Sequence, residues 1–221
     1  MKNNRNEFKR IFDDFLEICN RENIWYAVDG TTLLGTIRHG GFIPWDEKIQ
    51  VMMTEESYQK LRIVAKTKVY DSSDDKQVKK LSGFFVDDIY SNEEVQPFIE
   101  IRQMIPTTLN NIKKYRSFKH VFINFFKNRK LNTKTSINDL KASRFEGFIL
   151  LENRKQNLKK AWIQSISFKT ETKIFSGKEV QVPIEYKKIL SYWYGKKYMT
   201  AIMPKKLDIY ISPKNIIKEE V

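Results

Sequence analysis

The stretch from residue 28 to residue 53 constrains the fold most, because glycines, hydroxyl groups and charges crowd into it. Four of the chain's eight glycines lie there, at positions 30, 35, 40 and 41. Glycine accepts positive φ and lets a backbone approach a ligand closely. We expect a short helix after Gly30, capped by Thr31 or Thr32 and broken at Gly35 and at Gly40-Gly41. Its first N–H groups can bind an anion. The backbone of residues 30–32 is therefore a predicted phosphate cradle.

A strand is predicted after this helix. Pro44 excludes a helix in the loop that leads to it. Ile49, Val51 and Met53 occupy every second position, which is typical of a half-buried strand. Alternate strand residues point to the same side, so Lys48 and Gln50 share one face.

Three separate parts of the sequence share residues with one known family. The first consists of Gly30-Thr31-Thr32-Leu33-Leu34-Gly35, Arg38-His39 and Gly41-Phe42-Ile43-Pro44-Trp45-Asp46. The others are Phe98-Ile99-Glu100-Ile101 and, near the end, Val182-Pro183, Tyr186, Leu190, Tyr194-Gly195 and Tyr198-Met199. Together they resemble the LicD family, phosphotransferases of the nucleotidyltransferase fold that are related to the animal fukutin proteins. The resemblance implies an α+β fold over residues 1–221, with a nucleotidyltransferase-like mixed sheet flanked by helices.

The chain departs from the family where a metal is expected. The family runs Trp-Asp-Asp-Asp-Ile-Asp, whereas Trp45 is followed here by Asp46, Glu47, Lys48, Ile49 and Gln50. The resemblance implies that acids at positions 48 and 50 hold a divalent cation, Mg²⁺ or Mn²⁺. Lysine has no acceptor and glutamine is a neutral ligand, so we expect weak metal binding. The Lys48 ammonium is a candidate for the metal's place.

The resemblance also implies roles for individual residues. Asp46, Glu47 and Glu100 are the available catalytic acids, and Asp46 and Glu100 are the remaining metal ligands. Gly30, Thr31, Thr32, Arg38 and Lys48 are the candidate nucleotide and phosphate contacts, with Arg38 offering a planar fork of donors. Alternatives remain: Glu100 can face solvent or pair with Arg102 or Arg38, and Arg38 can pair with Asp46 instead of a ligand.

Bacterial LicD proteins are associated with moving phosphorylcholine from CDP-choline onto cell-surface glycans. We therefore expect a phosphotransferase that moves a phosphorylcholine-type group from a CDP-linked donor to a glycan or glycolipid hydroxyl, such as one on lipopolysaccharide or teichoic acid. The alternative is a catalytically inactive relative that binds a nucleotide or a partner. Nucleic acid ranks last as a ligand, since no helix-turn-helix, zinc-finger or RNP pattern occurs.

Charge leaves a membrane surface open as a partner. Forty Lys and Arg against 27 Asp and Glu give a formal net charge of +13, which attracts anionic lipid or nucleotide, or reflects a general lysine bias. A basic, aromatic helical insertion is predicted within residues 105–145, either lying on an anionic membrane or packed on the domain. Without an apolar leader or a long apolar span, we expect a cytoplasmic protein, with the inner face of the membrane as a peripheral site.

Periodicity predicts the other elements. Helices are expected over residues 5–23, after Thr54, over 158–166 and over 184–194. Strands are expected at 25–28, 68–70, 81–89 and 98–104, and a hairpin over 172–182 with its turn at Ser176-Gly177.

Overall fold

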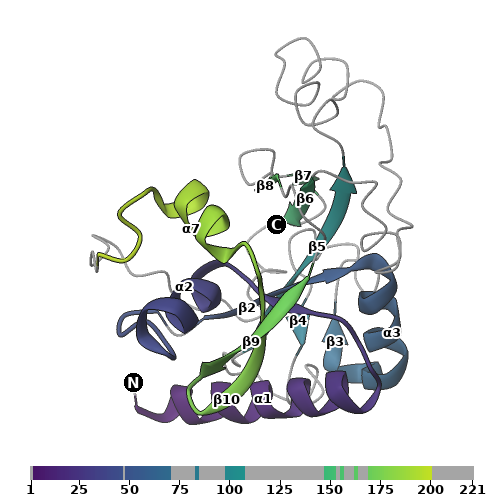
Figure 1. The fold of residues 1–221 in the computed structure, drawn as a ribbon. Coiled ribbons are helices and arrows are strands. Elements are labelled where there is room, and N and C mark those ends of the chain that lie inside the picture. Colours follow the sequence, from purple (N-terminus) through teal and green to yellow (C-terminus); the bar gives the residue numbers. More distant parts are fainter. Residues whose placement is uncertain are drawn as a thin grey trace, which may run out of the picture.

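A computed structural model describes residues 2–46, 48–70, 83–84, 98–107, 147–152, 155–156, 162–163 and 169–200. These residues form helices around a mixed sheet, together with a separate two-stranded sheet. The α+β class predicted from the sequence is confirmed (Figure 1).

Helix α1 (Lys2–Arg21) supplies a large part of the core. Its apolar residues recur at intervals of three and four, so they line one side of the helix. Phe8, Ile11, Phe12, Phe15, Leu16 and Cys19 are all buried. Among the aromatic rings of this face, Phe12 and Phe15 stack on each other, and Phe15 meets Tyr26 edge-on. The predicted helix is confirmed.

The main sheet is built on a parallel pair of strands, β2 (Ile49–Thr54) and β5 (Ile99–Thr107). Strand β1 (Ala27–Val28) pairs with β2 on one side, and β4 (Gly83–Phe84) and β3 (Val69–Tyr70) extend the sheet beyond β5. Strand β6 (Gly147–Glu152) also pairs with β5, and β7 (Lys155–Gln156) and β8 (Trp162–Ile163) pair with β6. The helix predicted over 158–166 is wrong at residues 162–163, where backbone pairing with β6 gives a strand.

Strand β2 is buried more completely than its alternation predicted. Val51, Met52 and Met53 are each at most 1% exposed, so successive residues are hidden on both faces. The strand lies between β1 and β5, and helices α2 and α3 contact it. A central strand covered in this way shows a continuous apolar run instead of a half-buried pattern.

Helix α2 (Gly30–His39) follows β1 directly and positions the predicted cradle. Asp29 takes the N-cap position with extended backbone, so Thr31 and Thr32 lie inside the helix instead of capping it. The helix also continues through Gly35 and ends at Gly40, which has the left-handed backbone of a C-cap. A side chain at Gly35 would overlap the carbonyl oxygen of Gly41, so this glycine permits a close approach and does not break the helix.

Helix α3 (Glu55–Ala65) begins as predicted. The Thr54 hydroxyl accepts a hydrogen bond from the Ser57 N–H at 3.1 Å, which is a standard N-cap contact. Tyr58 and Leu61 face inward and are fully buried. A short 3₁₀ turn (Lys66–Lys68) then leads into β3.

The predicted hairpin is confirmed as β9 (Thr170–Phe175) and β10 (Lys178–Pro183), joined at Ser176-Gly177. Figure 1 shows it crossing near α1, and Phe175 packs edge-on against Phe12 and Phe42. The Ser176 N–H donates to the Gly40 carbonyl at 2.7 Å, so the hairpin turn holds the end of α2. Helix α7 (Tyr186–Tyr194) follows and confirms the helix predicted over 184–194, with a start two residues later.

The predicted insertion over 105–145 begins too early, because Ile105–Thr107 belongs to β5. The rest of that insertion lies outside the described residues, as does most of the strand predicted over 81–89. Within the part of the chain that the structure describes, none of the helices combines the length and apolarity needed to cross a bilayer.

Replacing Gly35 tests the close approach inside α2. The substitution Gly35→Ala adds a methyl group against the Gly41 carbonyl, so it should lower the free energy of unfolding by about 1–3 kcal/mol. Urea unfolding followed by circular dichroism measures this loss. Gly40→Asn is the matched control, because nothing lies near a side chain at Gly40 and asparagine tolerates its φ of +64°. Equal losses for both variants would contradict the packing explanation.

Candidate functional site

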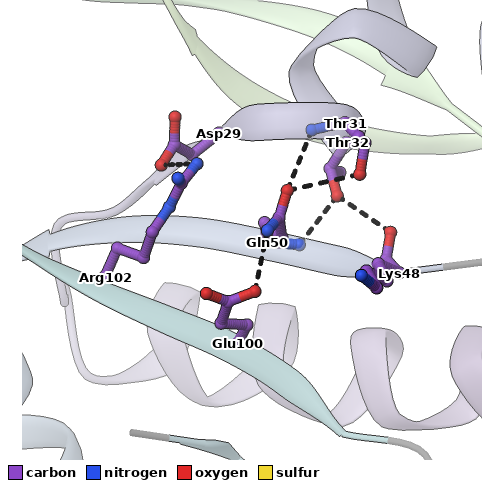
Figure 2. Close-up of polar contacts among 7 residues, drawn as sticks. All are labelled: Asp29, Thr31, Thr32, Lys48, Gln50, Glu100 and Arg102. Atoms are coloured by element: carbon purple, nitrogen blue, oxygen red, sulfur yellow. Dashed lines mark hydrogen bonds and ion pairs between the residues drawn. The ribbon is translucent and has the colours of Figure 1, made fainter. Parts of the chain in front are cut away.

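The candidate site lies where helix α2 begins above the parallel strands β2 and β5 (Figure 2). The strand register places Gln50 of β2 directly beside Glu100 of β5. The Asp29 N–H continues the β1–β2 pairing by donating to the Gln50 carbonyl at 2.9 Å. The first residues of α2, which follow Asp29, therefore lie next to Gln50. Residues from three elements therefore meet around one side chain, that of Gln50.

The Gln50 carboxamide joins the helix to the neighbouring strand. Its Nε2 donates to Glu100 Oε2 at 2.7 Å. Its Oε1 accepts from the Thr31 backbone N–H at 2.9 Å and from the Thr31 hydroxyl at 3.2 Å. An N–H donor requires an acceptor, so the Thr31 contacts fix the carboxamide with its NH₂ group toward the carboxylate.

Thr32 fastens the same helix turn to the backbone of β2. Its hydroxyl accepts from the Gln50 N–H at 2.7 Å and donates to the Lys48 carbonyl at 3.2 Å. Thr31 and Thr32 are residues of the predicted phosphate cradle, and the structure brings both beside positions 48 and 50. Leu33 is the first residue whose N–H bonds back to Asp29 within the helix, at 3.0 Å. Of the earlier N–H groups, that of Thr31 already donates to Gln50.

A buried ion pair lies beside this network, and neither of its residues was among the predicted site residues. Arg102 of β5 pairs with Asp29, and their side chains are 2% and 0% exposed. The Arg102 guanidinium also lies 5.5 Å from the ring centre of Trp193 in α7. A signal for this pair existed: Arg102 is two residues from Glu100 and so shares its strand face, and Asp29 directly precedes the first site glycine.

Gly30 separates the amide network from the ion pair. Its φ is +52°, and a side chain there would overlap Gln50 Oε1 and crowd Arg102 Nη2. Only glycine therefore fits between the two groups at the start of α2.

Arg38 lies at the other end of α2, over the loop that carries Asp46. Its guanidinium is 5.9 Å from the ring centre of Trp45, and its Nη1 donates to the carbonyls of Tyr198 at 3.2 Å and Thr200 at 3.3 Å. Its Nε donates to His39 Nε2 at 2.9 Å, and burial together with the nearby guanidinium lowers the pKa of His39. Arg38 thus contacts the segment after α7, a role that the sequence alternatives did not include.

The remaining predicted residues are placed as follows. The Asp46 carboxylate accepts from the Lys48 N–H at 3.0 Å, which shapes the loop before β2. Glu47 lies outside the described residues. Glu100, for which Arg102 or Arg38 was considered as a partner, accepts from Gln50.

Tyr194, the last residue of α7, connects both parts of the site electrostatically. Burial raises the pKa of its hydroxyl, and the carboxylates of Asp29 and Asp46 raise it further, while Arg102 and Arg38 lower it. A phenol is protonated near neutral pH already at its ordinary pKa of about 10, and the raised pKa keeps it so. The closing family pattern reaches the site through contacts of its own region: Trp193 lies against Arg102, and the Tyr198 carbonyl accepts from Arg38.

The described residues do not fit a divalent cation. No three His, Cys, Asp or Glu side chains gather closely enough among them to hold one. The Gln50 NH₂ group, a donor, faces Glu100 where a cation would have to lie. Glutamine and lysine at positions 50 and 48 thus supply an amide donor and an ammonium where the resemblance implied carboxylates.

This fold and this site define a nucleotidyltransferase-type domain. The chain matches the family described as LicD/FKTN/FKRP, nucleotidyltransferase domain, over residues 23–185, and it belongs to that family. It is also similar to the lipopolysaccharide cholinephosphotransferase LicD of Haemophilus influenzae (strain ATCC 51907 / DSM 11121 / KW20 / Rd), with 50% identity over 50 residues. Those residues are 23% of this chain and only 19% of that relative's length.

Breaking the buried ion pair tests how much it contributes to the stability of the fold. Arg102→Met leaves the Asp29 carboxylate buried without its cation, so the free energy of unfolding should fall by about 3–5 kcal/mol. Lys178→Gln is the control, since it breaks a pair with Asp13 whose side chains are 55% and 42% exposed. That change should cost less than about 1 kcal/mol. Urea unfolding measures both, and a similar loss for the two variants would contradict the assigned importance of Arg102.

Proposed function

We propose that this protein is a phosphotransferase that moves a phosphorylcholine-type group from a CDP-linked donor to a hydroxyl of a cell-surface glycan or glycolipid. The observation that carries the proposal is the convergence of the α2 start with Glu100 at the β2–β5 pair, inside the range that matches the LicD family. The relative named as a lipopolysaccharide cholinephosphotransferase supports the class of donor and acceptor.

The chemistry required is an in-line displacement at phosphorus. The acceptor oxygen forms a bond to the phosphorus that carries the transferred group, the bond from that phosphorus to the bridging oxygen breaks, and CMP leaves. Glu100 is the carboxylate assigned to receive the proton of the acceptor hydroxyl. Asp46 and Glu47 are the other acids proposed for this role.

Cationic groups are needed because charge develops on the leaving CMP. Arg38 can contact two phosphate oxygens at once, and Lys48 supplies a compact positive charge before β2. The backbone at the start of α2 is proposed to add donors at Gly30 and Thr32, because the Thr31 N–H already donates to Gln50. We assign no step to a divalent cation, because the described residues do not fit one.

A second function is favoured by one specific observation. The Gln50 amide is hydrogen-bonded to both the Glu100 carboxylate and the Thr31 N–H. In an active site these two groups would be directed at a ligand or a metal. The alternative is therefore a catalytically inactive relative that binds the nucleotide or a partner.

Turnover of CDP-choline separates these functions. With lipopolysaccharide as the acceptor, the active protein releases CMP and transfers phosphorylcholine, which ³¹P NMR and mass spectrometry detect. Glu100→Gln keeps an acceptor for the Gln50 NH₂ group but removes the base, so the rate should fall about 10²–10⁴-fold. Binding of CDP-choline by calorimetry without any CMP release supports the inactive relative. Absence of both binding and release contradicts the phosphotransferase and the nucleotide-binding form of the alternative.

Arg38 should contribute to nucleotide affinity. Arg38→Ala removes the proposed phosphate contact, so it should weaken CDP-choline binding by about 1.5–3 kcal/mol in calorimetry. Arg10→Ala, at an exposed position of α1, is the charge-matched control and should leave the affinity unchanged. If Arg38 only holds the carbonyls of Tyr198 and Thr200, the variant will melt earlier while binding CDP-choline as well as the parent does.

A further inference from the structure

We propose that the Gln50 carboxamide takes the place of a divalent cation as the bridge between Glu100 and helix α2, so that the site assembles without metal. A cation between strand acids neutralises carboxylates and joins the elements that carry them. In this chain the neutral amide joins the elements with hydrogen bonds, and with an amide at position 50 no second carboxylate stands beside Glu100 whose repulsion a cation would have to offset. Its NH₂ group donates to Glu100 at 2.7 Å, and its oxygen accepts twice from Thr31.

The surroundings leave the carboxamide a single orientation. Both Thr31 donors point at Oε1, so a flipped amide would face them with its own NH₂ group. Gly30 lies against the same oxygen and admits no side chain. The Gln50 backbone is held as well, since its N–H donates to Thr32 and its carbonyl accepts from Asp29. The amide donor therefore stays directed at Glu100.

Gln50→Glu turns this bridge into a cation site. One oxygen of the new carboxylate can still accept from Thr31, and the other replaces the NH₂ group opposite Glu100. Two carboxylates at that spacing repel each other unless a proton or a cation lies between them. We expect the variant to melt below the parent in EDTA and to be stabilised by Mn²⁺ or Mg²⁺. At a metal concentration about 100-fold above Kd the melting temperature should rise by about 5–10 °C.

The parent protein should show no such rise, and a matched control is available. Gln59 donates its amide to Glu55 at 2.8 Å on the exposed side of α3, so Gln59→Glu makes the same chemical change beside the same kind of acceptor. There solvent screens the repulsion, and neither EDTA nor Mn²⁺ should alter the melting temperature. A rise for the parent as large as that of Gln50→Glu, or no metal response in Gln50→Glu, would overturn the proposal.

A measurement on the parent covers the case in which Gln50→Glu does not fold. In ¹⁵N-labelled parent protein, Mn²⁺ should leave the amide signals of Thr31 and of the Gln50 NH₂ group sharp. Selective broadening of these signals at micromolar Mn²⁺ would place the ion at Glu100 and contradict the amide bridge.

A last experiment rests on the proposed function, because it uses a nucleotide ligand. Calorimetry of the parent with CDP-choline should give the same affinity in EDTA and in Mg²⁺, because the site already contains its bridge. An increase of tenfold or more with Mg²⁺ would contradict metal-independent assembly. Absence of CDP-choline binding in both conditions would count against the proposed function alone, since the melting and NMR results do not involve a nucleotide.

Discussion

The buried pair between Asp29 and Arg102 is the interaction on which the geometry of the site depends. It joins the residue that begins α2 to the middle of β5, across the strand that lies between them. Charges this deeply buried are tolerated only when they are paired, so the pair limits how α2 can be placed on the sheet. Gly30 then follows with φ +52° and fits against both the guanidinium and the Gln50 amide.

The elements that could be predicted from the sequence are those fixed by local rules. The apolar face of α1, the Thr54 cap of α3 and the Ser176-Gly177 turn depend on residues only a few positions apart. Predictions from local sequence were wrong where a contact with a distant segment determines the local structure. Gly35 was expected to end a helix, but it is retained inside α2 because the returning chain at Gly41 packs against it.

Only part of the site could be predicted, because some of its contacts depend on local motifs and others on tertiary pairing. The positions of Glu100, Thr31 and Thr32 followed from motifs, and the structure brings them to one point. The contact between Gln50 and Glu100 depends on the parallel register of strands that are far apart in the sequence, which no local pattern reveals. Arg102 was considered only as a partner for Glu100, because Arg102 and Asp29 are far apart in the sequence and the position of Asp29 before Gly30 did not by itself show which cation pairs with it.

These contacts also change which groups can attract an anion. A helix start normally offers both free N–H groups and the positive end of its dipole. Here the Asp29 carboxylate lies at the N-cap, so the dipole already has a negative neighbour, and Arg102 cancels that charge in turn. The Thr31 N–H is committed to Gln50. Attraction for a phosphate must therefore depend on side-chain cations outside this network more than the glycine motif predicted, and Arg38 and Lys48 are the residues of the signature that can supply it.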